Sequence, residues 1–474
     1  MTTLSFADFE LKNKMFDYKI NDRLIWKYIR FNLYELISNR SHIKEIKTHR
    51  NIFGVFRLLT GYIKYTRSFK NYSKKDILFL SHPRKIRQGE KYQDIYLDLL
   101  IKNHKDSSIV IDIPQVINNK VIHYETDYEN IVYNDGLYII NIFSRIFKSV
   151  ILQEKRIRKS KDFIKLVDMI NNNFNTYHNI EHIKDLIINA YFKIDIYRKF
   201  YKRILTKVNP KIIIEVISYS FDSIIINELA CEKNMKIVEV QHGTILSHHI
   251  GYQYDFKHYD FHPTHILLFG DYWKKNIKIS QNYTKLISVG FPYLEKRRLE
   301  ITSNYTKNNT ILFISQLEVG KAFYDFAILL LQSEISKKIN IIFKLHNEEF
   351  SCWKNIYPKL VSSQILVIDN NDSDIYNYLS IAKTIIVGKS TVLYEALMYD
   401  ADILSYNITF DPDLDYIEKN NITKSVKTFE DIYSQIYYNL DNRNKNERCI
   451  DKSIFWEINS RNKQLDIINE IIGE

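Results

Sequence analysis

The sequence predicts an α/β protein with two Rossmann-like parallel-sheet domains that face each other across a cleft. Short apolar, β-prone runs alternate with helical patterns along most of the chain, which is typical of parallel sheets. The length of 474 residues exceeds what one ordinary core accommodates, so about two or three domains are expected. Several apolar runs stop abruptly on polar residues, and open α/β sheets bind ligands beyond the carboxyl ends of their strands.

The composition is that of a folded globular protein. Apolar residues make up 45% of the chain and charged residues 26%, without the depletion of aromatic residues that marks disorder. The three cysteines show no CxxC spacing, so neither a disulfide framework nor a zinc site is indicated, and a reducing cytoplasm fits best. We also expect no secretory signal and no spanning helix, because the chain starts without a basic and apolar leader and no run reaches about 18 apolar residues.

The net charge of +11 fits nucleic acid, an anionic membrane or anionic substrates as partners. It also fits a general bias of the composition toward Lys, Asn, Ile and Tyr. A non-enzymatic nucleic-acid-binding protein is therefore one alternative. The sequence contains no zinc finger, RNP1 sequence or GxxG loop, so we expect no nucleic-acid partner.

We expect a helical N-terminal extension over residues 1–75, where Trp26, Ile29 and Leu33 place an apolar stripe on one helix face. A Rossmann-like acceptor domain is predicted over 76–299, with a basic helical region at 137–207. Its strands are expected at 76–80, 108–113, 211–216, 237–240, 265–270 and, followed by a turn, 287–292.

The polar, unpatterned stretch at 300–309 predicts the domain boundary. A Rossmann-like nucleotide-donor domain follows over 300–450, and a C-terminal helix is expected within 451–474. The strands of the donor domain are predicted at 310–314, 340–344, 365–368, 384–387 and 401–404, with helices between them.

The strand predicted at 384–387 leads into Ser390 and Thr391, which open an amphipathic helix. Backbone N–H groups and hydroxyls at a helix N-terminus bind anions, so these residues are candidates for holding a donor phosphate. Glu395 lies one turn further on the same face and can accept hydrogen bonds from a ribose. An ordinary Ser or Thr N-cap is the structural alternative, and the spacing is not that of a Walker A loop.

Two more strand ends of this domain carry groups suited to phosphate. Lys344 and His346 end one strand and can neutralise a departing diphosphate in place of a metal ion. Ser315 and Gln316 end another and offer hydroxyl and amide donors. Either pair alone also fits a solvated loop, and the three strand ends together make the stronger case.

The acceptor domain is expected to supply a general base. His242 follows the buried strand at 237–240 and is the first candidate for taking a proton from a sugar hydroxyl, with Glu215 as the second. A structural hydrogen-bonding role is the alternative for each. Further candidates on the acceptor side are His82, Gln241, His248, His249 and Tyr252, and Asp112 is another possible base.

No metal site is expected. His258, His262 and His265 add imidazole groups, but their spacing fits no zinc pattern and no cysteine accompanies them. The run Asp372-Ser373-Asp374 has the DxD spacing, yet it precedes a predicted helix and is better interpreted as a helix cap.

The strand ends at Gln241-His242-Gly243-Thr244, Lys344-Leu345-His346 and Ser390-Thr391 resemble those of bacterial glycosyltransferases of the GT-B fold that build capsule and lipopolysaccharide. The last two are more distantly similar to the His-Pro and Ser-Ser/Thr motifs of bacterial polysialyltransferases, and to CDP-glycerol glycerophosphotransferases. Asn347 stands where the polysialyltransferases have the proline of their His-Pro motif. Gln241 stands where the glycerophosphotransferases usually have a tryptophan.

The resemblance covers roughly residues 76–450. It implies transfer of a sugar from a nucleotide-activated donor onto a growing surface glycan, either capsule or lipopolysaccharide O-antigen, with no metal or other cofactor. It also implies that His346, Ser390 and Thr391 bind the donor phosphate and that Glu395 binds the ribose or another hydroxyl. A CDP-polyol phosphotransferase of teichoic-acid-like polymer synthesis is the alternative within the same fold.

Two stretches, 62–70 and 139–161, are both basic and aromatic. Amphipathic basic helices bind anionic membrane leaflets. We therefore expect a cytoplasmic protein that associates peripherally with the inner face of the membrane, where a glycan or lipid-linked glycan acceptor is extended. Solvated helix faces are the alternative.

Overall fold

The computed structural model describes residues 3–38, 63, 73–83, 85–117, 120–122, 124–134, 137, 148–302, 308–370, 373–407, 412–441 and 452–473. The chain divides into two compact units. The first contains Met1–Phe269, Trp273–Gly290 and Arg461–Glu474, and the second contains Gly270–Tyr272 and Phe291–Ser460.

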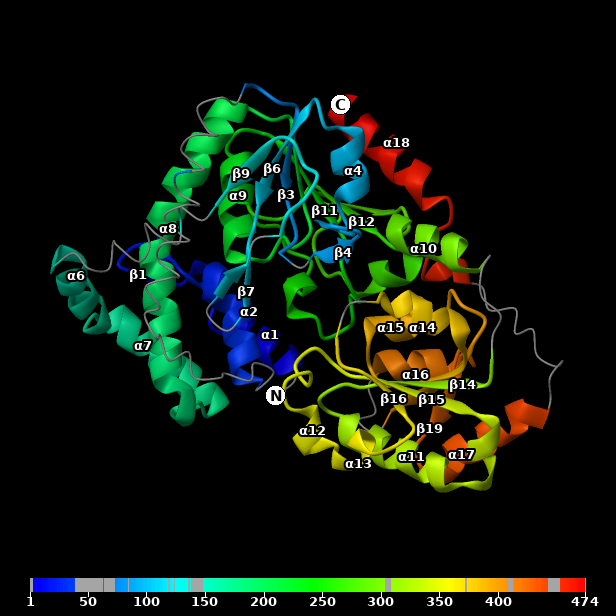
Figure 1. Ribbon diagram of the computed structural model, residues 1–474. Coiled ribbons are helices and arrows are strands. Elements are labelled where there is room, and N and C mark those ends of the chain that lie inside the picture. The colour runs from blue at the N-terminus through cyan, green and yellow to red at the C-terminus, as the bar shows by residue number, and fades with distance from the viewer. Residues whose placement is uncertain are drawn as a thin grey trace. The chain divides into compact units, whose positions relative to one another are not determined.

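The first unit is built on a parallel sheet that has, among the described residues, the strand order β13-β12-β11-β10-β3-β6-β9 (Figure 1). Alternate side chains point to opposite faces, so Ile212 and Ile214 pack with α4 (Asp98–Asn103) and α18 (Ser460–Gly473) on one face. Helices α9 (Phe221–Cys231) and α8 (Ile180–Val208) lie on the other side. The strands are β3 (Ile77–Leu80), β6 (Ser108–Asp112), β9 (Ile131–Tyr133), β10 (Ile212–Glu215), β11 (Lys236–Val240), β12 (His265–Leu268) and β13 (Lys285–Ser288).

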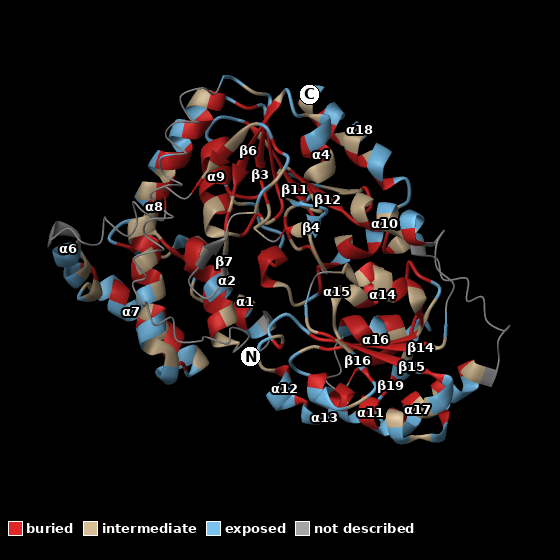
Figure 2. Ribbon diagram, viewed as in Figure 1, coloured by how far each residue is buried: buried red, intermediate tan, exposed pale blue. Residues whose placement is uncertain are grey.

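The second unit contains a parallel sheet with the order β16-β15-β14-β17-β18-β19 in its described part. In its core the rings of Phe313 and Phe343 stack, and Phe323 packs against Phe313 at a tilt. Figure 2 shows that the strands are buried. The strands are β14 (Thr310–Ile314), β15 (Asn340–Lys344), β16 (Leu366–Ile368), β17 (Ala382–Val387), β18 (Asp402–Tyr406) and β19 (Lys424–Val426). The helices include α10 (Pro292–Thr302), α11 (Gly320–Gln332), α14 (Ile375–Ile381), α15 (Thr391–Ala396), α16 (Pro412–Lys419) and α17 (Phe429–Asp441).

These two sheets confirm the predicted class of two Rossmann-like parallel-sheet domains of the GT-B type. Two boundaries differ from the prediction. The expected division at 299/300 falls inside α10, and the units separate between Gly290 and Phe291 instead. The C-terminal helix is not a separate element, because Ile468 and Ile471 of α18 are buried in the core of the first unit.

The predicted N-terminal extension is part of the first unit. Its helices α1 (Thr3–Lys12) and α2 (Trp26–Ile37) meet at a buried ion pair in which Glu10 accepts hydrogen bonds from Arg30 Nε at 2.5 Å and from Trp26 Nε1 at 2.5 Å. Arg30 also donates to the carbonyl oxygens of Ile250 at 2.5 Å and Gln253 at 2.6 Å. The guanidinium thereby fixes the turn that follows β11.

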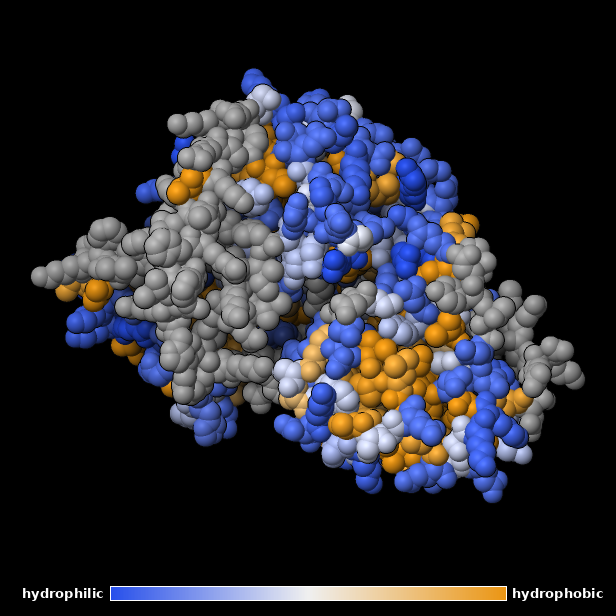
Figure 3. Space-filling model, in the orientation of Figure 1, coloured by the Kyte–Doolittle hydropathy of each residue, from blue (hydrophilic) through white to orange (hydrophobic). Residues whose placement is uncertain are grey.

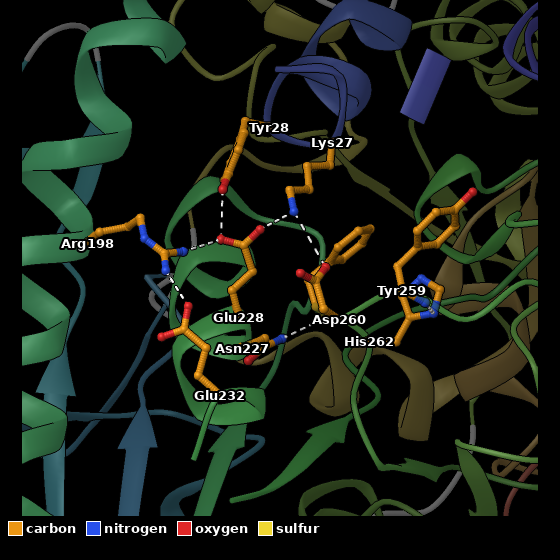
Figure 4. A network of polar contacts seen from close by, with 10 residues as sticks. Lys27, Tyr28, Arg198, Asn227, Glu228, Glu232, Tyr259, Asp260 and His262 are labelled. Carbon is orange, nitrogen blue, oxygen red and sulfur yellow. Dashed lines mark hydrogen bonds and ion pairs between the residues drawn. The ribbon is translucent and has the colours of Figure 1, made fainter. Parts of the chain in front are cut away.

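A second polar network joins α2 to α8 and α9 (Figure 4). Glu228 of α9 accepts hydrogen bonds from Tyr28 at 2.7 Å and Arg198 at 2.7 Å, and forms an ion pair with Lys27. Lys27 also contacts Asp260 in the loop before β12, at 3.4 Å. Three helices therefore meet at one buried carboxylate, and Lys27 connects it to the loop before β12.

No helix in the described part of the chain is both long and apolar enough to cross a bilayer. Of the stretch at 62–70 only Ile63 is described, and residues 139–147 also lie outside the described ranges.

Replacing Arg30 with Met is expected to destabilise the protein strongly, since Glu10 is then left as an uncompensated buried charge. The loss of unfolding free energy should be about 3–5 kcal/mol, measured by urea denaturation of the full chain. Lys184→Met is the matched control because its ion pair with Glu181 is exposed, and it should cost about 0.5 kcal/mol or less. Equal unfolding midpoints for the two variants would contradict the role assigned to Arg30.

Candidate functional site

Four neighbouring strands of the first sheet, β11, β10, β3 and β6, are parallel and therefore end at the same edge. The residues at and beyond their ends include Gln241, His242, Tyr219, His82 and Asp112. The edge brings His82 and His242 together, with 5.8 Å between their ring centroids. Two candidates of the acceptor side therefore lie next to each other at this edge.

We define the histidine cluster as His82, Tyr96, Tyr219, His242 and His249. The Tyr219 hydroxyl lies 3.4 Å from Nε2 of His242 and 3.3 Å from Nε2 of His249. The Tyr96 ring stands edge-on to His82, at 5.3 Å between centroids. The three histidines are half-buried, as is the neighbouring His248, and Nδ1 of His242 is itself buried.

Two buried carboxylates fix the turn after β3. Asp94 accepts a hydrogen bond from the His82 N–H at 2.6 Å, and burial raises the pKa of Asp94 to about 6. Asp112 bonds to Lys85 at 2.7 Å and accepts from Ser81 at 3.1 Å. Asp112 is thus engaged in a buried ion pair. Asp94 escaped the sequence prediction because its partner lies twelve residues away with no motif between them.

Two acceptor-side candidates hold the loop after β11 instead of facing solvent. Gln241 is fully buried, accepts from the Phe269 N–H at 2.8 Å and donates to the Gly243 carbonyl at 2.7 Å. Tyr252 is buried and donates to Glu239 at 2.7 Å. The polar groups of both are used within the protein.

Glu215 is also fully buried, beneath helix α9. Asn227 donates a hydrogen bond to it at 2.8 Å, and burial, assisted by Glu239, raises the pKa of Glu215 to about 8. A substrate hydroxyl does not reach a carboxyl group in this position. Of the two candidates for a base, His242 is the one that is partly exposed.

In the second sheet, β15, β14 and β17 are adjacent and parallel, so their carboxyl ends also meet. Glu349 connects the first two ends: it accepts from the Ser315 hydroxyl at 3.0 Å, the His346 N–H at 2.7 Å and the Tyr357 hydroxyl at 2.5 Å. Its own side chain is buried, whereas His346 is exposed. The sequence alone did not predict a role for Glu349. The one clue to it in the sequence is that Glu349 follows His346 by three residues.

Gln316 connects β14 to β17. Its amide group donates to the Lys389 carbonyl, and a Cβ atom on Gly388 would lie 2.5 Å from its side-chain oxygen. A side chain at position 388 would therefore displace the Gln316 amide from this position. Ser315 and Gln316 both make hydrogen bonds that fix the strand ends.

Lys344 is 8% exposed and donates to the Asn370 carbonyl at 3.0 Å. Its ammonium group lies 4.6 Å from the centre of the Phe350 ring. Burial lowers the pKa of Lys344 to about 8, so the side chain is a cation below that pH. A poorly hydrated cation at a strand end is well suited to an anionic ligand.

Ser390 is the N-cap of α15 and accepts a hydrogen bond from the Val392 N–H at 3.2 Å. This is the ordinary helix cap that the sequence indicated as the alternative to a phosphate-binding role. Thr391 begins the helix and is half-buried. Glu395 is half-buried, and burial together with Asp374 raises its pKa to about 7. Asp374 caps α14 by accepting from the Tyr376 N–H at 3.3 Å, which confirms the interpretation of that run as a cap.

In the part of the chain that the structure describes, no three His, Cys, Asp or Glu side chains are grouped so as to hold a metal ion. His262 instead lies among aromatic rings, 4.4 Å from Tyr254 between ring centroids.

Glu215→Gln should change how stability depends on pH. The pKa of Glu215 is about 8 in the folded protein against an ordinary 4.5, so the unfolded chain loses this proton first as pH rises. The wild type therefore loses stability between about pH 4.5 and 8, and the variant, which has no proton to lose there, should gain relative to it. Urea denaturation across this range tests the prediction, and a constant difference between the two proteins would contradict it.

No protein-family model matches the chain, and no curated protein sequence matches it. Solved structures do resemble it. One is UDP-GlcNAc 2-epimerase from Methanocaldococcus jannaschii, with 13% identity over 84% of this chain and 99% of that one and a TM-score of 0.48. Another is HepE from Anabaena in complex with UDP and glucose, with 10% identity over 84% and 100% and a TM-score of 0.45.

The lipopolysaccharide outer core galactosyltransferase WaaB, in its apo form, is 10% identical over 83% of this chain and 99% of its own, with a TM-score of 0.43. At identities of 10% to 13%, the likeness to these three proteins concerns the fold alone.

Proposed function

We propose that the chain is a glycosyltransferase that moves a sugar from a nucleotide-activated donor onto a growing bacterial surface glycan, of the capsule or O-antigen kind, without a metal ion. The observation that supports it most is the meeting of β15, β14 and β17 at one sheet edge, where each strand leads into groups suited to phosphate. The histidine cluster at the corresponding edge of the other sheet supplies candidates for proton transfer.

In this proposal the donor binds at the second sheet. The exposed His346 and the cationic Lys344 neutralise the diphosphate, and Thr391 at the start of α15 donates to it. Glu395 accepts from a ribose hydroxyl. Ser315, Gln316 and Ser390 contribute through the hydrogen bonds that hold the strand ends in place.

The reaction is a displacement at the anomeric carbon. The acceptor hydroxyl oxygen forms the new bond to this carbon while the bond to the diphosphate oxygen breaks, and the nucleoside diphosphate leaves. His242 takes the hydroxyl proton, and His82, His248 and His249 line the acceptor side. A positioned base of this kind contributes about 10²–10⁴-fold to the rate.

His346→Ala should weaken nucleotide binding by about 10–100-fold, the value of one or two hydrogen bonds to a charged group. His242→Ala should leave nucleotide binding intact and lower turnover by about 10²–10⁴-fold. Calorimetry with the nucleotide and a transfer assay separate the two effects. The exposed His178 serves as control, since His178→Ala should change neither. Full activity in both active-site variants would refute the assignment.

The released products distinguish the proposal from a CDP-polyol phosphotransferase. Sugar transfer releases a nucleoside diphosphate, or CMP when the donor is a CMP-sugar. The phosphotransferase releases CMP while phosphate moves to the product.

We further propose that helix α6 (Lys148–Arg158) binds the anionic inner leaflet, close to a lipid-linked acceptor. One side of α6 and the turn after it exposes apolar and basic side chains together, and Figure 3 shows such residues side by side over this helix. These residues are Ile151, Leu152, Lys155, Arg156 and Lys159. Apolar groups beside cations are what an interfacial helix requires.

Lys155→Glu combined with Arg156→Glu should weaken binding to phosphatidylserine vesicles by about tenfold or more at low salt, measured by co-sedimentation. Lys337→Glu combined with Lys338→Glu makes the same charge change at exposed positions of the second unit and should have a much smaller effect. Equal binding by both double variants would exclude α6 as the membrane contact.

A further inference from the structure

Tyr219 contacts two histidines of the cluster at once, through a single hydroxyl group. Its ring is held on several sides: Phe31 lies 4.8 Å away and Tyr252 5.5 Å away between ring centroids. A Cβ atom on Gly251 would lie 2.6 Å from the same ring, so only glycine permits this packing. The hydroxyl is thus fixed in position between Nε2 of His242 and Nε2 of His249.

The positions of the hydrogens follow from one backbone contact. The Gly251 N–H donates to Nδ1 of His249 at 3.2 Å, so that nitrogen carries a lone pair, and the hydrogen of the neutral ring is on Nε2. This Nε2–H points at the Tyr219 oxygen, which accepts it. The hydroxyl hydrogen of Tyr219 is then directed to Nε2 of His242.

Burial, together with the nearby Glu239, raises the pKa of Tyr219 well above its ordinary value, so the hydroxyl keeps its hydrogen. Other titratable groups also surround His242. His82 and Tyr96 face its ring at 5.8 and 6.3 Å, and Tyr252 with its bonded Glu239 packs behind Tyr219.

We propose that Tyr219 is a positioning residue that holds neutral His242 in the tautomer with its hydrogen on Nδ1, and that a substrate hydroxyl takes the place of the Tyr219 hydroxyl at Nε2 before His242 accepts its proton. Protonation of His242 at Nε2 would turn the Tyr219 hydroxyl away from its acceptor inside a buried site, which opposes protonation. His249 and Gly251 orient the hydroxyl from the other side. The catalytic importance of this tautomer rests on the proposed function, but the tautomer itself does not.

Long-range ¹H–¹⁵N NMR spectra of the full chain labelled at histidine test the tautomers directly, with His242→Gln and His249→Gln used for assignment. Neutral His242 should carry its hydrogen on Nδ1 and have none on Nε2. Neutral His249 should carry its hydrogen on Nε2 and have none on Nδ1. Tyr219→Phe should raise the pKa of His242 by about one, the worth of one hydrogen bond. Tyr96→Phe removes the hydroxyl of the other tyrosine of the cluster, whose ring stands edge-on to His242 at 6.3 Å, and should shift that pKa by clearly less.

Two results would overturn the inference: hydrogen on Nε2 of neutral His242 in the wild type, or a titration of His242 that Tyr219→Phe does not move. Equal shifts in the Tyr219 and Tyr96 variants would also overturn it, since they would indicate a general disturbance. These readouts need no activity. If the proposed function also holds, the acidic limb of the pH profile of kcat should move to higher pH in Tyr219→Phe, together with the pKa of His242. If the pKa of His242 shifts as expected but the protein shows no transfer activity, the result counts against the proposed function alone.

Discussion

The parallel alignment of the strands is the constraint on which both candidate sites depend. In a parallel sheet every carboxyl end lies at the same edge, so residues distant in sequence meet there without contacts of their own to bring them together. His82 and His242 are 160 positions apart in the numbering and become neighbours because β3, β10 and β11 are adjacent. The same register brings Ser315, Lys344 and Gly388 to one edge of the second sheet.

The positions of the strand ends do not determine the conformation of the loops that follow. Hydrogen bonds from buried polar groups fix these loops. Arg30 binds two carbonyl oxygens of the turn that carries His249, while Glu10 compensates its charge. Asp94 and Glu349 play the same part by accepting backbone N–H groups at His82 and His346. The N-terminal helices therefore support the candidate site through α2, in addition to contributing to the core.

The strands were predictable because isoleucine-rich runs of four to six residues stand between polar turns, as at Ile212–Glu215. Strand-end residues such as His242 were predictable for the same reason. The carboxylates that fix the loops were not, because a lone Asp94 or Glu349 looks like any solvated acid until burial is known. Burial likewise separates Glu215 and Gln241 from His242. Tyr219 was missed because its role depends on two histidines that follow it by 23 and 30 positions.

The central claim is that the strand ends of the second sheet bind a nucleotide-activated sugar, and ligand-induced thermal stabilisation tests it most directly. The full chain is melted with millimolar UDP-, GDP-, CMP- and CDP-linked donors, because a ligand that binds only the folded state raises the melting temperature according to its affinity and concentration. The account predicts a clear rise with one class of nucleotide sugar, reduced in His346→Ala. No rise with any of the four classes would contradict it.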